Sequence, residues 1–80
     1  MSAAPRSITF VVTEDSAGGF SAVARGLDGR TLATQGDDVG DLRGMIRDCV
    51  DAAYDPDDAA RPSLIHLHFV RDEVMTATPA

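Results

Sequence analysis

The residues of this sequence best suited to metal chemistry are two histidines, His66 and His68. They alternate with apolar residues in the segment Leu64 to Val70, as in a β-strand, so both imidazoles project from the same strand face. Such a pair can supply two ligands to zinc or another transition metal, but a closed tetrahedral site takes four ligands and no third is evident. The pattern therefore favours a half-exposed or interfacial strand face, and we expect no metal.

The other residues that could catalyse a reaction lack the partners such chemistry needs. Cys49, the single cysteine, falls on the apolar stripe of an expected helix and has no evident neighbouring base. The aspartates from Asp55 to Asp58 lack the ligand spacing of a calcium loop. The glycines occupy separate turns rather than one phosphate-binding loop. We expect no catalytic residue, no cofactor and no enzymatic activity.

The charge balance restricts the class of partner. Among the 80 residues, 13 are acidic and 7 are basic, which gives a formal net charge of -6. This charge repels the phosphate backbone of nucleic acids, because neutralisation of phosphates by Lys and Arg supplies most of that affinity. It favours encounter with a basic protein. We expect a basic protein partner and no direct binding of nucleic acid.

The distribution of apolar residues argues against a membrane protein. No apolar stretch approaches the roughly 20 residues that a membrane-spanning helix needs, and the longest candidate contains both histidines. The first residues show neither the basic region nor the apolar run of a secretory signal. We expect a cytoplasmic protein without membrane contact.

Alternation with period two and a later change to spacings of three and four predict a β-β-β-α-β order of elements. The first strand pairs with the second across a turn that contains Gly18 and Gly19, and Asp38 is placed to cap the helix, with Asp41 three positions later as in a capping box. The expected strands cover residues 7–13, 20–25, 31–35 and 64–70, and the expected helix covers residues 39–53.

This order predicts an α+β fold with the single helix on one face of a four-stranded sheet. A right-handed crossover through the helix makes the last strand parallel to the first and gives the strand order 3-2-1-4. We expect one domain over residues 1–80, with an ordered core over about residues 7–74. The third and fourth strands are then edges with unpaired backbone groups.

The sheet face opposite the helix is the predicted partner or oligomer surface. It mixes β-branched and amphipathic side chains, which suits partial burial against another protein. With the adjacent edge strand and a thin aliphatic core, it predicts a homodimer or a higher even-numbered oligomer. The predicted surface residues are Thr9, Val11, Val23, His66 and His68.

Three segments of the chain carry a family resemblance. They are the hairpin from Glu14-Asp15 through Gly18-Gly19 to Phe20-Ser21-Ala22, the connection Thr34-Gln35-Gly36-Asp37-Asp38 followed by Leu42, and the last strand Ile65-His66-Leu67-His68-Phe69-Val70. Together they resemble the HicB-like antitoxins of bacterial toxin-antitoxin pairs, over about residues 8–74. The likeness is to short stand-alone members without a DNA-binding extension.

The resemblance implies a fold similar to part of ribonuclease H, without nuclease chemistry. It also implies a protein-binding module that neutralises a small basic HicA-like toxin that cleaves messenger RNA. The alternative is an orphan homo-oligomeric domain with a structural or regulatory role. A third label, borrowed from the β subunit of 2-oxoisovalerate dehydrogenase, is disfavoured because 80 residues do not by themselves supply a thiamine-diphosphate cleft at a subunit interface.

Overall fold

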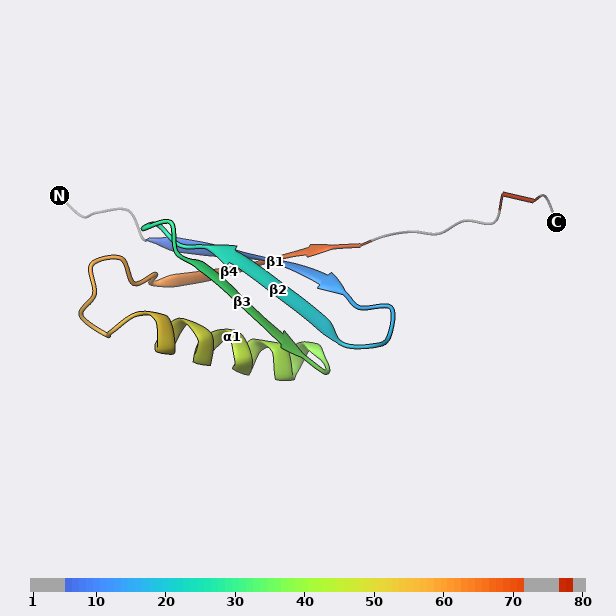
Figure 1. Ribbon diagram of the computed structural model, residues 1–80, viewed down its shortest axis with the longest axis horizontal. Helices are drawn as coiled ribbons and strands as arrows, with labels where there is room; N and C mark the ends of the chain where they lie inside the picture. The colour runs from blue at the N-terminus through green and yellow to red at the C-terminus, as the bar shows by residue number, and fades with distance from the viewer. Residues whose placement is uncertain (1–5, 72–76, 79–80) are drawn as a thin grey trace.

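The computed structural model describes residues 6–71 and 77–78 and has the predicted order of elements (Figure 1). Residues 72–74 of the expected ordered core lie outside the described residues. The elements are β1 (Ser7–Glu14), β2 (Phe20–Arg25), β3 (Thr31–Gly36), α1 (Val39–Ala53) and β4 (Leu64–Val70).

The four strands form one mixed sheet in the order β3-β2-β1-β4. The pairs β1–β2 and β2–β3 are antiparallel, and β4 is parallel to β1. Figure 1 shows α1 along one side of the sheet. The predicted α+β fold, its strand order and its single helix are therefore confirmed.

The core lies between α1 and the sheet face that it covers. Alternate residues of β1, β2 and β3 point to this face, and the helix contributes residues at spacings of four. Phe10 and Leu42 are fully buried. The buried residues are Ile8, Phe10, Val12, Ala22, Ala24, Leu32, Leu42, Ile46, Val50 and Tyr54.

The start of α1 is stabilised by the aspartates that the sequence indicates. Asp38 is the N-cap, and its carboxylate accepts a hydrogen bond of 2.7 Å from the Asp41 backbone N–H. The return bond differs from a capping box, because the Asp41 carboxylate accepts from the Asp37 N–H, at 2.9 Å, and not from the N–H of the cap itself. Both carboxylates lie where the helix dipole favours negative charge.

The corner between β3 and α1 requires a glycine. A Cβ atom added to Gly36 would lie 2.5 Å from the Leu42 backbone nitrogen and 2.6 Å from its Cα atom. Backbone atoms of the first helical turn cannot move aside as a flexible side chain can. Gly36 therefore allows the end of β3 to touch the helix closely enough for Leu42 to be buried.

Replacing Gly36 with Ala should destabilise the protein by about 1–3 kcal/mol, because the added methyl group overlaps backbone atoms. The matched control is Gly44→Ala: Gly44 lies inside α1, and a Cβ there meets nothing within 4 Å. This control should stabilise the protein by about 1 kcal/mol, since Ala is the better helix former. Urea denaturation followed by circular dichroism measures both changes, and equal effects of the two variants would contradict the tight corner.

Tyr54, at the end of α1, joins the helix to the β2–β3 turn. Its ring is buried, its hydroxyl donates to the Asp28 carboxylate at 3.2 Å, and the Arg30 guanidinium lies 4.6 Å from the ring centroid. The ring hydroxyl also occupies the space that a Cβ of Gly26 would need. Burial, then the hydrogen bond to Asp28, raises the pKa of the Tyr54 phenol. The pKa of the Asp28 carboxyl is lowered mainly by the hydrogen bond that this carboxyl accepts from the Arg30 backbone N–H.

Stability should therefore fall at alkaline pH through Tyr54. The unfolded phenol ionises near pH 10.0 and the folded one at a higher pH, so its stabilising contribution is complete below pH 10.0 and is lost as the pH rises through the raised value. Tyr54 is the single tyrosine and no tryptophan is present, so ultraviolet absorbance reports its ionisation directly. Asp28→Asn should move the ionisation back toward pH 10.0. An ionisation already at that pH in the unmodified protein would contradict this role.

Candidate functional site

Strand β4 is an edge strand without the features that usually protect an edge. Its seven residues, LIHLHFV, contain no charged residue, proline or glycine. The other edge strand, β3, carries polar residues at Thr31, Thr34 and Gln35 and packs beside α1. The unprotected edge of the sheet is therefore at β4.

None of the β4 side chains is buried, although most of them are apolar. Ile65, Leu67 and Phe69 pair in register with the core residues of β1 and so point to the helix side of the sheet. Alternation in the sequence favours burial of these three, but α1 packs against β3 and β2, and of the three only Leu67 is partly buried against the core. Ile65 is 37% exposed and Phe69 is 48% exposed. Sequence patterning alone did not indicate this exposure.

The five residues predicted as a partner surface lie together on the open face of the sheet, away from α1. Thr9 pairs with His66, and Val11 lies between His68 on one side and Val23 on the other. All five are exposed, Val11 by 43% and Val23 by 49%. The geometry brings the predicted set into one patch, and its role as an interface stays a prediction.

Introducing a carboxylate into the open face should weaken association through that face. On this face the four strands present no carboxylate, and their one charged side chain is that of Arg25. Val11→Asp and His66→Asp should each reduce association without changing the circular dichroism spectrum. Unchanged mass and partner binding in both variants would show that the open face is ordinary surface.

A groove separates α1 from β4 on the helix side of the sheet. Ile46, Ile65 and Leu67 give it an apolar floor, and Arg43 and Arg47 line it from the helix. The two arginines make this part of the helix basic although the chain is acidic. A basic partner is therefore better placed elsewhere on the molecule.

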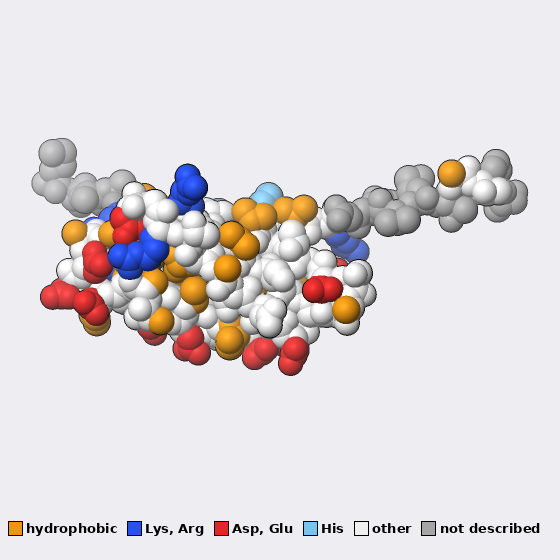
Figure 2. Space-filling model, in the orientation of Figure 1, with side chains coloured by type: hydrophobic (Ala, Val, Ile, Leu, Met, Phe, Trp, Pro, Cys, Tyr) orange, Lys and Arg blue, Asp and Glu red, His pale blue; other side chains and the backbone are white. Residues whose placement is uncertain are grey.

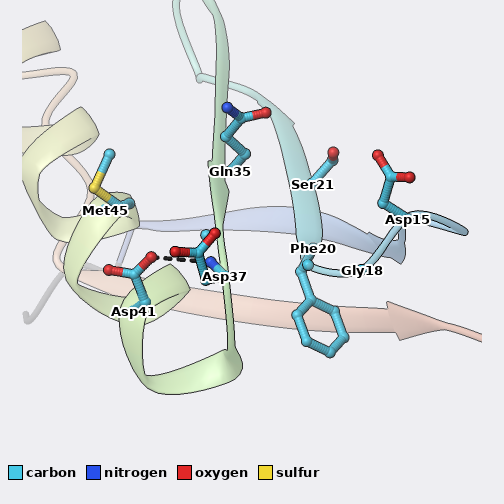
Figure 3. A pocket seen from close by; sticks show the side chains of 10 residues that line it. Asp15, Gly18, Phe20, Ser21, Gln35, Asp37, Asp41 and Met45 are labelled. Atoms are coloured by element: carbon cyan, nitrogen blue, oxygen red, sulfur yellow. Dashed lines mark hydrogen bonds between the residues drawn. The ribbon is translucent and has the colours of Figure 1, made fainter.

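An acidic hollow lies at the opposite side of the helix, where β3 joins α1 (Figure 3). Asp37 and Asp41 approach it from the helix start, Asp15 from the β1–β2 turn, and Phe20 and Met45 add apolar surface. The Asp41 carboxylate accepts from the backbone of Asp37, as the dashed line in Figure 3 shows. No basic side chain lines this hollow. Its chemistry suits a Lys or Arg side chain, which combines an apolar stem with a charged head.

The described residues show no arrangement typical of a metal centre. Within residues 6–71 and 77–78, no group of three His, Cys, Asp or Glu side chains is placed to hold a metal ion. Cys49 is partly buried beside β3, with its Sγ atom 4.0 Å from the Ala33 carbonyl oxygen. The buried set of the described chain includes no charged residue. The two groups with shifted pKa values, Asp28 and Tyr54, bind each other.

Comparisons with models of protein families, with curated proteins and with solved structures give no match to this chain. The relationship to HicB-like antitoxins and to part of ribonuclease H therefore stays a prediction from the three segments quoted above. In the part of the chain that the structure describes, no helix has the length and apolar character to cross a membrane.

Proposed function

We propose that this domain is a non-catalytic protein-binding module. The observation that carries the proposal is β4, an edge strand with apolar side chains exposed on both of its faces. Contiguous apolar surface of this kind marks interaction sites in soluble proteins. Its unpaired backbone groups add a row of hydrogen-bonding positions that another polypeptide strand can use.

The partner that we propose is a small basic polypeptide, which the domain neutralises as a HicB-type antitoxin neutralises a HicA-like toxin that cleaves messenger RNA. The formal net charge of -6 supports this choice. Figure 2 shows acidic side chains gathered along the lower side of the molecule, where Figure 1 places α1. Complementary charge mainly raises the rate and selectivity of encounter. We place this activity in the cytoplasm.

The acidic hollow is the part of the surface that best fits such a partner. Its three aspartates and the apolar surface of Phe20 and Met45 can hold one or two basic side chains. None of the residues that line it belongs to β4. Basic side chains at the hollow and apolar contact at β4 therefore use separate surfaces.

A second candidate function is a homo-oligomeric structural or regulatory domain. The same edge strand favours it, because β4 has the composition of a buried strand and self-association would bury it. The two candidates differ in whether a basic polypeptide binds in addition to a second copy.

Affinity purification of the tagged full chain from its native host tests the first candidate. The expected result is co-purification of a small basic polypeptide in defined stoichiometry, with binding that weakens as salt is raised. Asp37→Lys should reduce capture of the basic polypeptide at least tenfold, because it reverses a charge in the hollow. The substitution removes no helix cap, because the Asp37 carboxylate caps no described backbone group. Recovery of no basic polypeptide would contradict the antitoxin proposal.

The matched control for this charge reversal is Asp57→Lys. Asp57 is an exposed residue in the loop between α1 and β4 and does not line the hollow. The Asp57→Lys substitution changes the net charge by the same amount. It should therefore lower capture of the basic polypeptide only slightly, through the long-range electrostatic field. Equal losses in the two variants would show that net charge alone, and not the hollow, selects the partner.

A further inference from the structure

The sequence of β4 reads the same in both directions when its residues are grouped by chemical type. Leu67 is central, with a histidine on each side of it at His66 and His68. Beyond the histidines come large apolar residues, Ile65 on one side and Phe69 on the other, and Leu64 and Val70 stand at the ends. A symmetric order of this kind is what a strand needs in order to pair with a copy of itself.

We propose that β4 pairs antiparallel with β4 of a second copy, about a two-fold axis through Leu67. In a two-fold interface the same surface of both copies is used. If residue i of one copy contacts residue j of the other, then residue j of the first copy also contacts residue i of the second. Centred on Leu67, the pairing sets Leu67 opposite Leu67 of the second copy. It sets His66 opposite His68, Ile65 opposite Phe69 and Leu64 opposite Val70.

This register keeps like side chains together on both faces of the joined sheet. Ile65, Leu67 and Phe69 point to the helix side, so the central leucine pair is flanked by two pairs of apolar residues. On the open face, two pairs of histidines lie between two outer pairs of aliphatic residues. A shift of the register by one residue would place apolar side chains opposite histidines.

The pairing also closes the assembly. It consumes the β4 edge of both copies and leaves only the β3 edges, which are polar and packed beside α1. A two-fold pair of this kind does not propagate into a fibre. Because β4 contributes nothing to the acidic hollow, each copy keeps that hollow free.

The proposal rests on the proposed function in one respect, namely that β4 is a binding surface. It goes further by assigning the occupant of the β4 edge, which is a second copy of this chain, and the register of contact. A heterologous polypeptide added to the same edge is the competing occupant.

Introduced cysteines test the register directly. In the Cys49→Ala background, Leu67→Cys should give a disulfide-linked dimer under mild oxidation, because opposite residues of an antiparallel pair lie about 4.5–5.5 Å apart between Cα atoms. The matched control is Ile65→Cys, whose two copies would be more than about 13 Å apart, too far for a disulfide. Adding Phe69→Cys to that control should restore the cross-link.

Light scattering and sedimentation of the unmodified full chain complete the test. A mass twice 8.4 kDa at micromolar concentration, together with the cross-linking pattern above, supports the proposal. Phe69→Asp should raise the dissociation constant of the dimer at least tenfold. Leu27→Asp should not, since Leu27 is 63% exposed on the β2–β3 turn, away from β4.

Two results would overturn the self-pairing. A monomer at tens of micromolar would remove it, and so would a dimer in which Ile65→Cys alone cross-links as well as Leu67→Cys. Either result leaves the proposed function intact if the monomer or that dimer still captures a basic polypeptide in an Asp37-dependent way. Conversely, a dimer with the predicted cross-links that captures no basic polypeptide would support self-pairing and remove the antitoxin proposal.

Discussion

The single helix of this domain does not cover the whole of its four-stranded sheet, and the position of that helix decides which surface stays open. A helix with its side chains is about 10–12 Å wide, whereas the outer strands of a four-stranded sheet lie about 14 Å apart between their axes, before side chains are added. The corner at Gly36 brings the first turn of α1 against the end of β3. The helix then packs over β3 and β2, and Ile65 and Phe69 on the helix side of β4 stay exposed.

The rest of the helix is held in that position from its far end. The buried ring of Tyr54 lies under the β2–β3 turn, where Asp28 and Arg30 contact it. Arg61 donates to the Tyr54 carbonyl at 2.8 Å and pairs with Asp51, which ties the loop before β4 to the end of the helix. The helix is thus fixed at both ends against the β2–β3 side, and a rotation toward β4 would break both attachments.

Local signals in the sequence predicted the elements because each signal acts over a few residues. Alternation located the strands, spacings of three and four located the helix, and Asp38 marked its first turn. The parallel pairing of β4 with β1 followed from the handedness of the crossover. The bounds of β4 agree with the expectation at both ends.

What the sequence did not reveal depends on packing between distant segments. Alternation shows that Ile65 and Phe69 share a side of β4, but it cannot show whether the helix reaches that side. Tyr54 gave no periodic signal, because its role comes from contact with the turn 26 residues earlier in the chain. The five residues of the open face could be grouped because alternation with period two places them on one face of the sheet, whereas the acidic hollow combines a turn, two strands and a helix.

The two proposed binding surfaces follow from the same asymmetry of the fold. The helix leaves apolar side chains uncovered on the β4 side and brings the acidic start of α1 to the end of β3 on the other. Strand β4 exposes apolar side chains on both of its faces, so it has the stronger requirement for a permanent neighbour. The hollow is lined by three aspartates as well as apolar groups, which suits a surface that is occupied only when a basic polypeptide is present. The proposed pair of copies, with two available acidic sites, would therefore combine a covered apolar edge with an acidic exterior.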